Sequence, residues 1–255
     1  MCYTVAYLTK KKITYAKRAG ASDDEVKELQ LQLEELTATQ PAMYHISGFA
    51  HPKLICFTRD DGPQFQLVRW GLIPHWVKDH AQAAIMGRQT LNARGGTIFE
   101  KPAFRIAAQH RCLVLVDGFF EFFHFAKRTF PYHIRLKDDA VMALGGITSV
   151  WQDPETGSSM NTLSIVTTEA NPLMAGIHNN PKAQGPRMPF IVPKELDEQW
   201  LSTRTENDRI SSLIMPFPEL DLEAFTVAPL LGKHASPNTK EAIAPFEYPE
   251  LALLG

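Results

Sequence analysis

Cys2 is the first residue whose type and position together could do chemistry. An initiator methionine is normally removed when a small residue follows it, so we expect the mature chain to begin with Cys2. A terminal cysteine carries an amine and a thiol on adjacent carbons, and part of an α-amine with a pKa of about 7.7–8.0 is neutral at pH 7. That amine can attack an aldehyde to give an imine, which the thiol can close into a thiazolidine ring. Taken alone, Cys2 could equally be a small apolar residue near a chain end.

Three later stretches supply side chains that could assist such a reaction. Asn92 lies in Thr90-Leu-Asn-Ala-Arg94, Glu121 ends Asp117-Gly-Phe-Phe-Glu121, and His178 precedes Arg187-Met-Pro189. Glu121 follows two phenylalanines and an apolar strand, and partial desolvation there would raise its pKa and suit acid/base catalysis. His178 could move protons near neutral pH. Each residue also has an ordinary structural interpretation, so none is specific by itself.

The order of these and other motifs resembles the SRAP family (SOS response-associated peptidase). The match runs from residue 1 to about Leu201 and consists of Met1-Cys2, Arg69–Trp76, Asn92–Arg94, Lys101–Arg105, Arg111–Val114, Asp117–Glu121, Thr167–Asn171, Ile177-His178 and Arg187–Pro189. The resemblance implies a DNA-damage response protein that binds single-stranded DNA and crosslinks to abasic sites through a thiazolidine on its N-terminal cysteine. It also implies peptidase-type self-maturation, because removal of the preceding residue exposes that cysteine.

The resemblance also implies roles for individual residues. Cys2 would be the nucleophile, Asn92 would orient the adduct, and Glu121 and His178 would transfer protons as the sugar ring opens and the crosslink forms. Phosphate or base contacts would come from six further residues, namely Arg94, Arg105, Arg187, Trp70, Trp76 and Phe104, with the aromatic rings stacking or wedging near the lesion.

Four departures from the family pattern stand out. The chain opens Met-Cys-Tyr-Thr instead of Met-Cys-Gly-Arg, so a phosphate-gripping arginine at position 4 is missing, and Lys10–Lys12 or Arg18 could replace it. Gly-Phe-Phe-Glu-Phe stands where Gly-Phe-Tyr-Glu-Trp is usual. An acidic helix is inserted around Ser22–Leu36, and eight residues separate His178 from Arg187 where the family has few.

Local patterns predict the elements that must position these residues. Ser22-Asp-Asp-Glu25 predicts a helix N-terminus with an apolar face of Val26, Leu29, Leu33 and Leu36. An Asp-Gly turn predicts a hairpin of Lys53–Thr58 and Gln64–Trp70. Further predicted elements are strands in Cys112–Val116, Tyr132–Leu136, Val141–Trp151 and Leu163–Thr167, and a short helix in Lys194–Ser202.

The strands and helices do not alternate as βαβ units, which favours an α+β fold on antiparallel sheet. The resemblance specifies this fold as a single domain around a curved, barrel-like, mainly antiparallel β-sheet with peripheral helices. We therefore expect one domain over residues 1–235, with an acidic helical insertion at about 22–40, and a Pro-rich C-terminal tail over 236–255.

Charge is unevenly distributed along the 255 residues. The 26 Lys and Arg residues against 28 Asp and Glu give a net charge of −2, which argues against a generally basic nucleic-acid coat. Residues 21–40 carry −5 and residues 217–255 carry −4, so the rest of the chain carries +7. A body of that charge could attract phosphate locally, although charges also cluster by chance on solvated faces.

Several partners and compartments are disfavoured. No apolar run approaches the ~18 residues of a membrane span, and three scattered cysteines form no disulfide framework. We therefore expect a cytoplasmic protein, nucleoid-associated when bound to DNA. The chain has no CxxC or HxxxH pairing for zinc and no sign of a nucleotide cofactor. We expect it to act as a monomer without metal or cofactor.

Two other functions remain open. N-terminal-nucleophile amidotransferases and hydrolases also begin Met-Cys, although their oxyanion and amino-acid-binding motifs are not evident here. A non-catalytic single-stranded DNA-binding module would share the basic body and the aromatic residues.

Overall fold

The computed structural model describes residues 2–7, 12–19, 22–38, 40–60, 62–232 and 235–251. Lys10 and Lys11, two of the residues expected to replace the missing arginine, lie outside these ranges, as does the side chain of Lys12.

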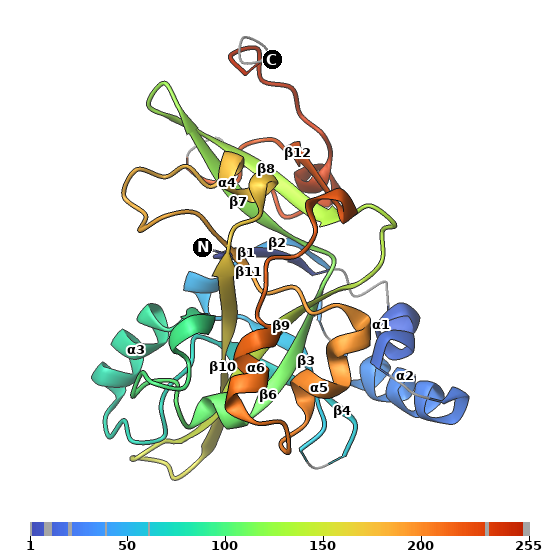
Figure 1. The fold of residues 1–255 in the computed structure, drawn as a ribbon, viewed down its shortest axis with the longest axis vertical. Helices are drawn as coiled ribbons and strands as arrows, with labels where there is room; N and C mark the ends of the chain where they lie inside the picture. Colours follow the sequence, from blue (N-terminus) through green and yellow to red (C-terminus); the bar gives the residue numbers. More distant parts are fainter. Residues whose placement is uncertain are drawn as a thin grey trace.

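A closed five-stranded barrel forms the centre of the molecule (Figure 1). Its strands are β3 (Lys53–Thr58), β4 (Gln64–Trp70), β6 (Arg111–Val116), β9 (Met142–Gln152) and β10 (Ser159–Glu169). Antiparallel ladders run β4-β3-β6-β9-β10, and a short parallel pairing of β10 with β4 closes the ring. The expectation of a barrel-like sheet in an α+β fold is confirmed, with mixed strand directions.

Alternate residues of the barrel strands enter two apolar clusters, as the two-residue period of a strand requires. Leu54, Cys56 and Val114 pack in one cluster together with Cys2. Their neighbours Ile55 and Phe57 face the other cluster, which the helices cover. Cys2 therefore packs in the cluster that the barrel interior forms.

A second, antiparallel sheet lies above the barrel in the order β12-β8-β7-β1-β2 (Figure 1). Its strands are β12 (Leu222–Thr226), β8 (Arg128–Leu136), β7 (Gly118–Phe125), β1 (Thr4–Tyr7) and β2 (Met43–Ser47). Only Asp117 separates β6 of the barrel from β7 of this sheet, and its backbone N–H donates to Ala6 O over 2.9 Å. This single-residue crossing fixes the start of β7 beside β1.

Helices lie around both sheets. They are α1 (Lys12–Ala19), α2 (Asp23–Thr37), α3 (His80–Gln89), α4 (Pro172–Ile177), α5 (Asp197–Leu201) and α6 (Asn207–Leu213). The predicted cap of α2 is confirmed, since Ser22 Oγ accepts a hydrogen bond from Glu25 N and Leu29 and Leu33 are buried. The hairpin of β3 and β4 is also confirmed with its expected bounds. The helix expected in Lys194–Ser202 is a 3₁₀ turn, η5 (Lys194–Leu196), that continues as α5.

The C-terminal segment follows the surface of the second sheet. Tyr248 Oη donates to Val227 O over 2.7 Å, and its ring meets Phe130 of β8 edge-on at 5.0 Å between centroids. A 3₁₀ turn, η7 (Lys240–Ile243), buries Ala242 against Phe120 and Leu230. Among the helices in the described ranges, none combines the length and apolar character that a membrane crossing needs.

Candidate active site

Cys2 lies where the two sheets meet, immediately before β1. Its side chain is fully buried. Burial and the nearby Glu121 carboxylate raise the pKa of the Cys2 thiol to about 12. The thiol is therefore protonated at neutral pH, because burial in a poorly polarisable environment disfavours the thiolate.

Asn92 holds the main chain of Cys2. It belongs to β5 (Asn92–Arg94), a three-residue strand that pairs in parallel with β10 through Ile165. Asn92 Nδ2 donates to the carbonyl oxygen of Cys2 over 2.9 Å. Its Oδ1 is buried and has no hydrogen-bond partner within the described part of the chain, so a polar acceptor is available beside Cys2.

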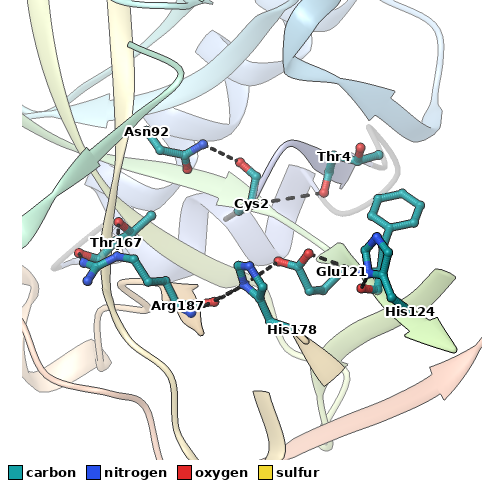
Figure 2. A network of polar contacts seen from close by, with 9 residues as sticks. Cys2, Thr4, Asn92, Glu121, His124, Thr167, His178 and Arg187 are labelled. Atoms are coloured by element: carbon teal, nitrogen blue, oxygen red, sulfur yellow. Dashed lines mark hydrogen bonds and ion pairs between the residues drawn. The ribbon is translucent and has the colours of Figure 1, made fainter. Parts of the chain in front are cut away.

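Glu121 and His178 form a buried pair on the opposite side of Cys2 (Figure 2). Glu121 Oε2 lies 3.4 Å from His178 Nδ1, and the two side chains are 8% and 4% exposed. Glu121 Oε1 also accepts a hydrogen bond from Phe122 N over 3.1 Å. Both carboxylate oxygens are thus oriented by groups of the protein.

The contacts around His178 Nδ1 favour one tautomer of its ring. Nδ1 lies 2.9 Å from the carbonyl oxygen of Arg187. Glu121 Oε2 and Arg187 N each lie 3.4 Å from the same nitrogen. The two acceptors, the carbonyl at the shorter distance and the carboxylate, favour a proton on Nδ1, which leaves Nε2 as the acceptor of the neutral ring. Helix α4 sets this geometry, because Asn171 Oδ1 caps it at Met174 N and His178 is its C-cap residue.

Arg187, whose carbonyl contacts His178, connects the Glu121–His178 pair to strands β10 and β11. It begins β11 (Arg187–Pro189), which pairs with β10. Its guanidinium donates to Thr167 O over 2.7 Å and to Thr167 Oγ1 over 3.2 Å. Desolvation and the proximity of Arg94 lower the pKa of Arg187. The Arg187 guanidinium is thus held on Thr167 of β10, near Arg94.

The long connection between His178 and Arg187 does not displace His178. Asn179 exchanges two hydrogen bonds with the backbone of His124 on β7, of 2.7 and 2.9 Å. Gln184 Oε1 accepts from Arg94 Nη2 over 2.8 Å. The extra residues are thus attached to β7 and to β5, and His178 remains beside Glu121.

Comparison with known proteins places the chain in a family. The family model for the SOS response associated peptidase (SRAP) matches residues 1–234. The chain is 36% identical over 190 residues to abasic site processing protein YoqW of Bacillus subtilis, covering 72% of this chain and 80% of that protein. It is 26% identical over 202 residues to abasic site processing protein HMCES of Gallus gallus, covering 71% of this chain and 57% of that protein.

Solved structures agree in fold. A crystal structure of a protein from Bacteroides thetaiotaomicron has a TM-score of 0.81 and 33% identity, covering 96% of this chain and 100% of that one. One from Bordetella bronchiseptica has a TM-score of 0.68 and 19% identity, covering 89% and 99%.

The chain belongs to the SRAP family.

The expectation that Trp70 stacks against DNA in this SRAP protein is wrong. Trp70 is fully buried, and its indole N–H donates to Leu91 O over 2.8 Å. A Cβ on Gly48 would lie 3.0 Å from its six-membered ring. The ring thus has no face open to a base, since barrel closure places it in the core.

The other residues expected to contact DNA differ in how exposed their side chains are. Trp76 is 40% exposed, and Arg105 is exposed. Phe104 is partly buried against the apolar cluster that the helices cover. Arg18 does not substitute for the missing arginine, because it forms an ion pair with Asp197 at 2.8 Å and donates to Val192 O. Position 4 itself holds a buried threonine.

Sequence reasoning missed an aromatic pair next to the SRAP cysteine. Tyr3 and Phe49 lie with ring centroids 5.0 Å apart and planes inclined by 33°. Phe49 is 51% exposed. The sequence signal for this pair was Tyr3, which stands where the family usually has glycine after the cysteine. Phe49 is distant in sequence, and only the fold brings it into contact with Tyr3. In the described residues, no three His, Cys, Asp or Glu side chains group closely enough to hold a metal ion.

Proposed function

We propose that this protein processes abasic sites in single-stranded DNA by forming a covalent crosslink through Cys2 once Met1 has been removed. The observation that carries the proposal is the position of Cys2 between Asn92, which holds its carbonyl, and the buried Glu121–His178 pair. Membership of the SRAP family and the names of the relatives, abasic site processing proteins, support it.

The reaction balances with groups that the site holds. The α-amine of Cys2 attacks the aldehyde of the ring-opened sugar, and loss of one water gives an imine. The thiol then adds to the imine carbon, its proton passes to the imine nitrogen, and a thiazolidine results. Because the thiol stays protonated at neutral pH, the amine is the first nucleophile.

Glu121 and His178 supply the proton transfers in this proposal. Glu121 accepts a proton from the attacking amine and returns it to the departing water. The basic Nε2 of His178 assists at the sugar oxygen, with the ring held by Arg187 O and Glu121. Asn92 Oδ1, buried and without a partner among the described residues, would accept a hydrogen bond from the newly formed amine of Cys2.

Two further activities, removal of Met1 and release of the crosslink, belong to the same proposal. We infer that the site also removes Met1 by thiol-type self-cleavage, and that it can release the crosslink in a lyase-type step. Arg94, Arg105 and Arg187 would bind phosphates, with Trp76 and Phe104 contacting bases near the lesion.

The functional unit would be residues 1–235, acting as a monomer without metal or cofactor. Within this unit, the acidic helix at about 22–40 would be an insertion. Residues 236–255 would form a C-terminal tail outside it. The protein would work in the cytoplasm, at the nucleoid when bound to DNA.

Intact mass spectrometry tests the proposal directly. We expect purified protein to lack Met1, and an abasic single-stranded oligonucleotide to add its own mass less one water. Intact DNA should add nothing. Cys56→Ala is a matched control, since it removes another buried cysteine and should leave the adduct unchanged.

Two results would overturn the proposal. A heat-stable adduct that persists in Cys2→Ala would exclude the thiazolidine. Glutamine hydrolysis that depends on Cys2, without any adduct, would instead indicate an amidotransferase.

A further inference from the structure

The loop before β3 presents an aromatic ring beside the reactive end of the chain. This loop is the 3₁₀ turn η2 (Gly48–Ala50), and Phe49 is its central residue. Gly48 N donates to Tyr3 O over 2.8 Å, so the loop is bonded to the residue that follows Cys2. The rings of Tyr3 and Phe49 are in contact, with centroids 5.0 Å apart and planes inclined by 33°.

Several contacts fix the loop rigidly. Ser47 Oγ accepts a hydrogen bond from Phe49 N over 3.3 Å. His51 ends the turn in the left-handed region at φ 52°, and its Nδ1 donates to Trp70 O over 2.8 Å. Trp70 packs against Gly48, where any added Cβ would lie 3.0 Å from the ring. The buried tryptophan thus supports the loop that carries the exposed phenylalanine.

The ring pair is within electrostatic reach of the reacting groups. Burial, the Glu121 carboxylate and Cys2 together raise the pKa of Tyr3, which is half-buried. Phe49, on the outer side of the pair, is 51% exposed. Isolated exposed apolar side chains are common on proteins, but the ring of this one packs against the residue adjacent to the nucleophile.

We propose that Tyr3 and Phe49 form a stacking platform for the nucleobase that flanks the abasic site. The inference rests on the proposed function. An abasic nucleotide cannot stack on its neighbour, so the flanking base presents a free face, and an aromatic side chain can bind the face of any base. The subsite therefore recognises a single-stranded nucleobase without sequence preference, and it replaces a contact that the buried Trp70 cannot make.

Binding to a stable abasic analogue separates this subsite from the crosslinking chemistry. The probe is single-stranded DNA with one tetrahydrofuran abasic analogue, which has no aldehyde, and 2-aminopurine on its 5′ or 3′ side. Stacking quenches 2-aminopurine fluorescence. We expect wild-type protein to quench the probe on one side, and Phe49→Ala to lose the quenching and bind roughly 5- to 150-fold more weakly.

Matched variants control the experiment. Phe49→Trp should restore the quenching, and Tyr3→Phe should keep it because the ring and not the hydroxyl is needed. Phe246→Ala removes another exposed phenylalanine, 44% exposed, beside β12 at the other edge of the second sheet, and should behave as wild type. Circular dichroism melts identify any variant that is unfolded, and Phe49→Leu then replaces Phe49→Ala.

The two proposals fail in different ways. If wild-type protein forms no adduct with authentic abasic DNA, the proposed function fails. If it forms the adduct, and both Phe49→Ala and Tyr3→Ala quench and bind like wild type, the platform is wrong while the function stands.

Discussion

Asn92 binds the main-chain carbonyl of Cys2 with one end of its amide, over 2.9 Å, while the other end is buried without a partner in the described residues. The same side chain can therefore hold the backbone of the nucleophile and accept a hydrogen bond from its amine. This hydrogen bond connects β5, which pairs with β10 of the barrel, to the residues just before β1 of the second sheet.

Replacing Asn92 should slow crosslinking more than it weakens DNA binding. In Asn92→Ala the Cys2 carbonyl loses its donor, a loss of about 1–3 kcal/mol for a buried group, and the nucleophile is less well oriented. We expect the single-turnover rate with abasic DNA to fall roughly tenfold or more, with unchanged affinity for the tetrahydrofuran analogue. Asn161→Ala, at an exposed asparagine bonded to Gln66, should keep the wild-type rate. Equal rates in both variants would contradict the role of Asn92.

Glu121→Gln should impair proton transfer while preserving shape. General acid/base groups typically contribute about 10²–10⁴-fold, so we expect a loss of that order in the crosslinking rate, and a similar loss for His178→Asn. Rapid-quench gels with abasic oligonucleotide measure it. His80→Ala is the control, because that histidine is 48% exposed and pairs with Asp153. A wild-type rate in Glu121→Gln would remove the carboxylate from the mechanism.

The rate of Cys2 alkylation should still be rising steeply with pH at about pH 10. Burial and Glu121 raise the thiol pKa to about 12, so the thiolate fraction should rise about tenfold per pH unit across pH 7–10. An ordinary thiol levels off above about pH 9. Iodoacetamide labelling, followed at the Cys2 peptide by mass spectrometry, gives the profile. Glu121→Gln removes one cause of the shift and should move the profile to lower pH, whereas urea-unfolded protein should level off as an ordinary thiol does.

Arg94 should contribute to the salt dependence of DNA binding. Each phosphate contact on a single strand adds about 0.7 to the slope of log K against log salt. We expect Arg94→Ala to lower the magnitude of the slope by about that amount, measured by anisotropy between low and moderate salt. Arg209→Ala serves as the control, since that arginine is exposed and its guanidinium donates to Gln199. An unchanged slope in Arg94→Ala would mean that its guanidinium stays on Gln184.

Truncating Trp70 should lower the stability of the protein, whereas truncating Trp76 should weaken its binding to DNA. Trp70→Ala removes a fully buried ring and should lower the free energy of unfolding by about 3–5 kcal/mol. Trp76→Ala, at a ring 40% exposed, should change it by no more than about 0.5 kcal/mol and weaken DNA binding. Urea titration by circular dichroism and anisotropy separate the two effects. A fully stable Trp70→Ala protein that cannot bind DNA would reverse our interpretation of that ring.

Elements encoded by short stretches were predictable. The cap at Ser22, the apolar face of α2 and the hairpin of β3 and β4 depend on residues within one or two turns of each other. Helix propensity, capping and turn chemistry act locally, so a single sequence suffices to predict them. The closing pairing of β10 with β4 was not predictable in this way, because its partners are distant in sequence and packing selects their register.

The sequence by itself determined the chemistry that the site could perform. Cys2 next to the initiator, and the ordered motifs around Asn92, Glu121 and His178, indicate a nucleophile with proton-transfer partners, and the family is confirmed. Only the tertiary structure decided which groups meet. Glu121 and His178 come within 3.4 Å, Trp70 enters the core, and Phe49 packs against Tyr3. The physical reason is that side-chain type fixes what a residue can do, whereas burial and long-range strand pairing fix what it touches.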